Sequence, residues 1–140
     1  MSNIRIGLMT SAALVSMCFT AAVPAQQSPM TFFVTSAGSG KGADLGGLAG
    51  ADRICQSLAD AAGAGKRTWR AYLSTTASGN SPAVNARDRI GKGPWHNAQG
   101  RLIARDVTEL HEGVNNINRT TALTEKGAFV NSRASSPNTH

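Results

Sequence analysis

The clearest pattern along the chain is an apolar stripe over residues 48–62. Apolar side chains recur there at steps of three and four, which is the spacing of one face of an α-helix. Gly63 follows where a helix commonly ends. We therefore predict one long amphipathic helix whose buried face consists of Leu48, Ala51, Ile54, Cys55, Leu58, Ala59 and Ala62.

Three shorter segments have the β-branched, aromatic or alternating composition that is typical of strands. They are residues 31–35, 69–75 and 101–104. In the second segment Trp69, Ala71 and Leu73 alternate with other residues, so we expect them to share one side of a strand.

Two short helices are also predicted. Residues 82–90 would begin with Pro82 at the first helical position, and residues 106–111 would begin after Asp106 as the N-cap. Trp95 and His96 are expected in a turn between them. Because strands and helices follow one another without a regular βαβ order, the predicted class is α+β, a small mixed sheet with one long packed helix.

The first 25 residues have the composition of a secretory signal peptide. Arg5 provides the positive start, an uncharged apolar stretch follows, and small residues precede the predicted cleavage before Gln26. The alternative is an uncleaved anchor, but the apolar run is shorter than the roughly 20 residues that span a bilayer. We expect a secreted or periplasmic protein of residues 26–140, with no membrane insertion after cleavage.

Charge narrows the range of partners. The formal charge of +6 becomes +5 when Arg5 leaves with the leader, which favours anionic extracellular polymers over neutral ones. The arginines and lysines are not clustered, so no nucleic-acid partner is predicted. Residues 131–140 contain no large apolar residue and are expected to be mobile.

The cysteine count leaves one thiol without a disulfide partner in the mature chain. Cys18 lies in the leader, so only Cys55 remains after cleavage. It is either a small core residue, one half of a disulfide whose partner is absent, or the link in a disulfide-bonded dimer. A lone cysteine cannot form a structural zinc site, and we predict no cofactor.

Several segments together resemble a known family. In order they read GGLAGADRICQ at residues 46–56, WRAYLS at 69–74, AVNARDRI at 83–90 and GPW at 93–95. This combination resembles bacterial secreted proteins related to the endostatin domain of collagen, which have a C-type-lectin-like fold. The resemblance covers roughly residues 31–140, and it implies that the domain is incomplete at its C-terminus.

The resemblance also implies features that this chain lacks. In lectin-like domains the cysteine matched by Cys55 pairs with one on a late strand, and no such residue is present. Ser136-Pro137-Asn138 has serine where calcium-dependent lectins have an acidic or amide side chain. We therefore expect no calcium site.

Catalytic patterns are equally absent from the sequence. Asp106, Glu109 and Glu112 share a helical face, but no H-E-x-x-H spacing is present, so a solvated face is predicted. The expected function is a secreted, non-catalytic binding module for a glycan or extracellular polymer, and the alternative is an envelope protein-interaction domain. The candidate ligand-binding residues are Arg70, Tyr72, Arg87 and Trp95.

Overall fold

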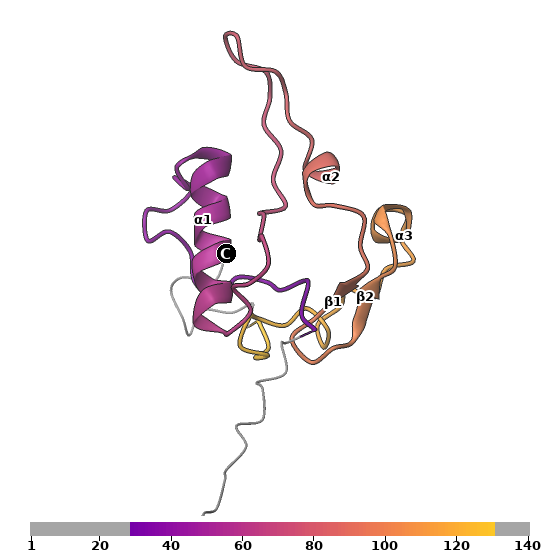
Figure 1. The fold of residues 1–140 in the computed structure, drawn as a ribbon. Coiled ribbons are helices and arrows are strands. Elements are labelled where there is room, and N and C mark those ends of the chain that lie inside the picture. Colours follow the sequence, from indigo (N-terminus) through magenta and orange to yellow (C-terminus); the bar gives the residue numbers. More distant parts are fainter. Residues whose placement is uncertain (1–28, 131–140) are drawn as a thin grey trace, which may run out of the picture.

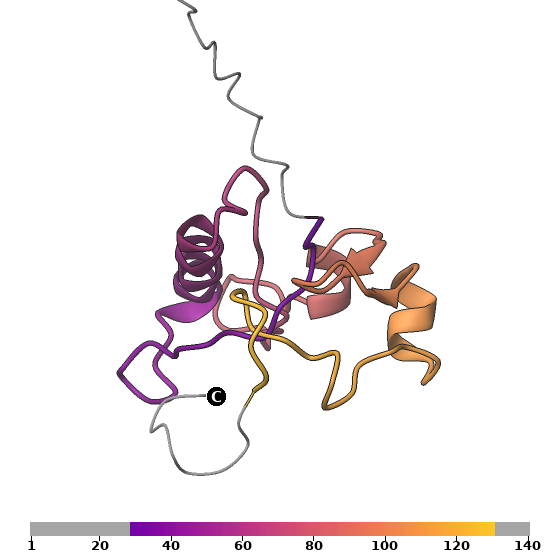
Figure 2. The ribbon, with the colours of Figure 1, turned by 90° about the horizontal axis from the view of Figure 1, so that it is seen from below.

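A computed structural model describes residues 29–130 of the protein. Its elements, in chain order, are α1 (Gly47–Ala61), α2 (Ala86–Arg89), β1 (Trp95–His96), β2 (Leu102–Ala104) and α3 (Val107–His111). Figure 1 and Figure 2 show α1 on one side and the β1–β2 sheet with α3 on the other. The predicted leader (1–25) and the tail predicted to be mobile (131–140) lie outside the described residues.

Helix α1 confirms the prediction from the apolar stripe, to within one residue at each end. At its start, a side chain on Gly50 would place Cβ only 1.9 Å from the carbonyl oxygen of Leu45, so this turn requires glycine. At its end, Gly63 has a φ of 75°, a left-handed conformation that glycine adopts without strain.

The two strands predicted at 31–35 and 69–75 are wrong as sheet strands, and the second contains a tight turn in which the Leu73 N–H donates to the carbonyl of Ala71 at 2.9 Å. Val34 makes only an isolated parallel bridge to Thr124, and Thr31 and Phe32 donate backbone N–H groups to the carbonyl of His96 at 2.8 and 2.9 Å. Residues 69–71 are held by side chains of α1 instead of a neighbouring strand. The predicted mixed sheet is therefore a two-stranded antiparallel sheet, β1–β2, within residues 29–130.

Residues 75–84 form a narrow hairpin that projects away from the rest of the fold in Figure 1. Isolated antiparallel bridges join Thr75 to Val84 and Ser78 to Ser81. Pro82 thus lies in the hairpin, and the helix predicted from it begins later, at Ala86. The reason is the Asn85 side chain, which accepts the backbone N–H of Arg87 at 3.0 Å and provides the N-cap.

The β1–β2 sheet pairs Trp95 with Ala104 and His96 with Leu102, with a register shift between the two pairs. Strand β2 confirms the strand predicted at 101–104, whereas β1 replaces the turn expected at Trp95 and His96. Helix α3 begins as predicted, because the Asp106 side chain accepts the backbone N–H of Glu109 at 2.8 Å.

The hydrophobic core is thin and divided into two clusters. Six of the eleven buried hydrophobic residues are alanines, which bring little apolar area each. One cluster joins Trp69 to α1 and the other joins Trp95 to β2. Large apolar side chains consequently stay exposed, among them Tyr72, Leu73, Leu102, Val114, Ile117 and Phe129.

None of the helices within residues 29–130 has the length and apolar character needed to span a membrane.

Candidate binding groove

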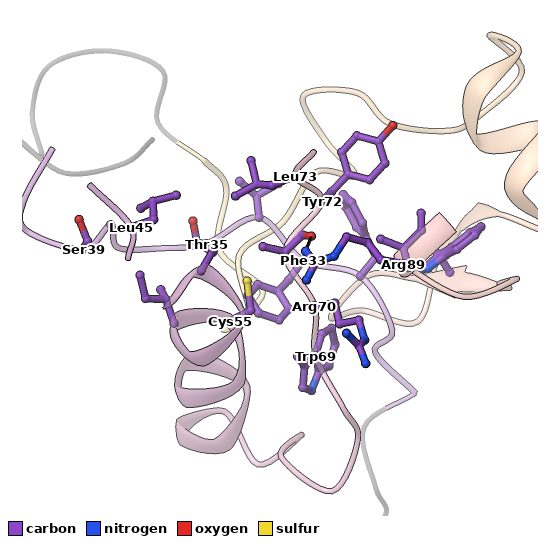
Figure 3. Close-up of a pocket in the computed structure, with 18 of the residues that line it drawn as sticks. Phe33, Thr35, Ser39, Leu45, Cys55, Trp69, Arg70, Tyr72, Leu73 and Arg89 are labelled. Atoms are coloured by element: carbon purple, nitrogen blue, oxygen red, sulfur yellow. Dashed lines mark hydrogen bonds between the residues drawn. The ribbon is translucent and has the colours of Figure 1, made fainter. Parts of the chain in front are cut away.

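A groove of about 1220 Å³ lies between α1 and the segments that face it. Its walls come from residues 31–45, one face of α1, residues 68–73, residues 89–91 and the α3 region. Figure 3 shows the side chains around this hollow, with Cys55 on the helix side and Leu73, Tyr72 and Arg89 opposite. The groove therefore collects residues that are far apart in the sequence.

The lining is mostly apolar, and its charges have one sign. Half-buried apolar side chains form its interior, including Phe33, Val34, Ile54, Ile90 and Leu110. The arginines that line it are Arg70 and Arg89, and no lining residue is an aspartate or a glutamate. An anionic ligand would meet no like charge on these walls.

Arg89 is fixed in place by hydrogen bonds to two groups from two other parts of the fold. Its guanidinium donates to the Asp52 carboxylate at 2.6 Å and to the carbonyl oxygen of Ala71 at 2.7 Å. The same carboxylate accepts the backbone N–H of Ala71 at 2.8 Å. This network ties α1, residues 69–71 and α2 together and so sets the width of the groove.

Arg70 has more freedom than Arg89. Its guanidinium is 4.0 Å from Asp52, and its side chain is 51% exposed, against 10% for Arg89. Because Asp52 is already paired with Arg89 at 2.6 Å, two positive charges share one negative charge. The cluster keeps a net positive charge, and Arg70 is its solvent-accessible member.

Tyr72 and His111 meet across the groove. The Tyr72 hydroxyl lies 2.7 Å from Nε2 of His111, and Nδ1 of the same ring lies 2.6 Å from the carbonyl oxygen of Val107. A carbonyl oxygen only accepts, so Nδ1 of His111 donates to Val107, and Nε2 forms the hydrogen bond with the Tyr72 hydroxyl. Tyr72 remains 56% exposed, which leaves much of its ring available for contact with a ligand.

Glu109 stabilises the turn that leads into α3. Its carboxylate accepts the backbone N–H and the guanidinium of Arg105, at 2.7 and 2.9 Å, and these hydrogen bonds hold its pKa below the usual range. A depressed folded-state pKa contributes stability that is present above the unfolded-state pKa and lost as the pH falls through the folded-state value.

We accordingly expect unfolding free energy to decrease below about pH 4, partly through Glu109. The variant Glu109→Gln should lose that part of the pH dependence, measured as urea unfolding at a series of pH values. Glu112→Gln, on the exposed C-terminal cap of the same helix, serves as the control. If Glu109→Gln shows the same dependence of stability on pH as the wild type, Glu109 does not contribute to the loss of stability in acid.

Cys55 lies half-buried on the groove wall, against the cluster that contains Trp69. Burial raises the pKa of its thiol, the nearby Asp52 carboxylate adds to the increase, and Arg89 opposes it. The protonated form is therefore favoured, which lowers its reactivity. The half-buried position suits the core alternative for Cys55, and the two disulfide alternatives stay predictions.

The groove contains three of the four predicted ligand-binding residues. Arg70, Tyr72 and Trp95 line it, but Trp95 is only 8% exposed and packs in the core with Ile103. Arg87 is exposed and is not among the lining residues. The sequence prediction missed Arg89, although it is part of the motif at residues 83–90 that carries the family resemblance.

Two of the three acidic residues near α3 have structural partners. Asp106 caps the helix and Glu109 pairs with Arg105. Within residues 29–130, no group of three or more His, Cys, Asp or Glu side chains is arranged to hold a metal ion.

Comparison with known proteins identifies no relative of this chain. The chain matches no family model, and neither a curated protein nor a solved structure matches it significantly.

Proposed function

We propose that this protein is an exported, non-catalytic binding module with a C-type-lectin-like, endostatin-like fold, and that the groove is its ligand site. The fold assignment rests on the motifs at 46–56, 69–74, 83–90 and 93–95. The packing of Cys55 on α1 against the cluster around Trp69 supports it, because the resemblance implies an inward-facing thiol at this position.

The single observation that carries the proposed function is the composition of the groove. It combines apolar walls with arginines and has no acidic lining residue. The rim has an exposed aromatic ring, Tyr72, and an accessible guanidinium, Arg70, two positions apart in the chain. An aromatic face can stack on the C–H face of a sugar, and a guanidinium can donate to its hydroxyl or carboxylate oxygens. A glycan or another extracellular polymer fits this rim.

The experiment is a glycan array together with a heparin column at moderate salt. We expect retention by the wild-type protein and binding about two- to ten-fold weaker for Tyr72→Ala, since an aromatic contact contributes about 0.5–1.5 kcal/mol. Phe129→Ala is the matched control, because Phe129 is 61% exposed and does not line the groove. Absence of retention on both supports, or equal loss in the two variants, would contradict glycan binding at this rim.

A second candidate function is a protein-interaction domain of the envelope without affinity for sugars. The aliphatic interior of the groove favours it, because Val34, Ile54 and Ile90 offer no hydrogen bonds to hydroxyl groups. A polypeptide with apolar side chains would bury these residues more fully than a sugar would.

A further inference from the structure

The interior of the groove, below the rim formed by Arg70 and Tyr72, lacks a partner in the described chain. Its half-buried apolar residues come from three places: Val34 before α1, Ile54 within α1 and Ile90 after α2. An apolar concavity of this kind binds apolar groups by removing them from water. The ligand must therefore carry apolar groups.

Size and charge restrict the ligand further. Small-molecule pockets usually measure about 300–1,000 Å³. This groove, at 1220 Å³, is larger, which suits a segment of a polymer. Arg70 and Arg89 share the single Asp52 carboxylate, so the rim keeps a net positive charge, and no lining residue is acidic. The matching ligand carries negative charges next to its apolar groups.

A second copy of the chain does not meet this requirement. The chain without its predicted leader has a formal charge of +5, and two grooves facing each other would bring their Arg70 side chains together without any acidic lining residue between them. Like charges placed together across an interface disfavour association. A polysaccharide has anionic groups but few aliphatic ones for the interior.

We propose that the interior of the groove binds a polypeptide segment in which acidic residues alternate with aliphatic ones. The aliphatic side chains pack between α1 and residues 33–34, and a carboxylate pairs with Arg70 at the rim. This inference rests on the proposed function, that the groove is a ligand site, and names the chemistry of a ligand for its interior.

The test uses the purified protein and short fluorescent peptides of leucine and glutamate, measured by fluorescence anisotropy. Matched peptides replace either glutamate by lysine or leucine by serine. We expect the protein to bind the leucine–glutamate peptide and neither of the two matched peptides. The affinity should fall as the salt concentration increases. Arg70→Gln should weaken binding about two- to five-fold, as for an exposed ion pair, and Arg70→Lys should restore most of it.

Two matched controls separate the groove from the rest of the surface. Arg67→Gln removes the same charge from an exposed residue outside the lining and should leave the affinity unchanged. Leu73→Ser should weaken binding, whereas Leu102→Ser should not, since both leucines are 38% exposed and only Leu73 lines the groove. Circular dichroism confirms that each variant is folded.

The outcomes distinguish this inference from the proposed function. Binding of an acidic polysaccharide but of no peptide would overturn the inference and leave the binding module standing. Equal binding of the glutamate and lysine peptides would also overturn it. If the protein binds no peptide and is retained neither on the glycan array nor on the heparin column, both the inference and the proposed function are overturned.

Discussion

Replacing Arg89 by methionine is expected to lower the free energy of unfolding by about 2–4 kcal/mol, because it takes the closest positive charge from the partly buried Asp52 carboxylate. The Arg89 side chain is 10% exposed and Asp52 is 22% exposed, so water compensates the lost ion pair only in part. The variant also loses the hydrogen bond to the carbonyl oxygen of Ala71, which has a length of 2.7 Å.

Urea unfolding followed by circular dichroism measures this effect, and α2 itself offers the control. Arg87→Met removes the same charge from an exposed position on the same helix and should change the stability by no more than about 0.5 kcal/mol. The double variant Asp52→Asn/Arg89→Met should lose less than the sum of its single variants, because both act on one network. Similar losses for Arg87→Met and Arg89→Met would contradict the network.

The Arg89→Met replacement should also affect the ligand site. Arg89 holds residues 69–71 against α1, and these residues carry Arg70 and precede Tyr72 at the rim of the groove. Loosening this segment would misplace the rim even where the protein stays folded. Arg89 therefore acts on the site chiefly as a positioning residue.

The sequence predicted the elements whose signals are local. Helix α1 follows from its apolar spacing, and α3 follows from Asp106, since an N-cap acts within one turn. The segments at 31–35 and 69–75 have the composition of strands but form none, because what they bond to depends on distant groups. Side chains of α1 hold the second segment through Gln56 and Asp52, over sequence separations of 13 and 19 residues.

The candidate site was predicted in part for the same reason. Arg87 and Arg89 lie two positions apart in a helix of four residues, too short to show which face is buried. The structure places Arg89 on the groove and leaves Arg87 outside it. Trp95 was predicted as a ligand-binding aromatic, but the pairing of β1 with β2 draws it into the core beside Ile103.

Trp69 is the residue whose loss should affect the thin core most. It is 9% exposed and packs against Met30, Ala59 and Ala64, and its ring centroid lies 4.7 Å from that of Phe33. Its indole N–H donates to the carbonyl oxygen of Ala64 at 3.0 Å. Its backbone N–H donates to the Gln56 side chain at 3.0 Å, which attaches it to α1.

Trp69→Ala is therefore expected to lower the free energy of unfolding by about 3–5 kcal/mol, the usual range for removing a buried tryptophan. If the total stability is near the lower limit of about 5 kcal/mol for natural domains, the variant should no longer unfold cooperatively. Trp69→Phe retains a ring but leaves the Ala64 carbonyl without the indole donor, so its cost should be smaller, about 1–3 kcal/mol. Tyr72→Ala is the matched control, because Tyr72 is 56% exposed on the same segment. Thermal and urea unfolding measure the stability of the three variants. If Trp69→Ala loses no more stability than Tyr72→Ala, the cluster around Trp69 does not hold α1 to the rest of the domain.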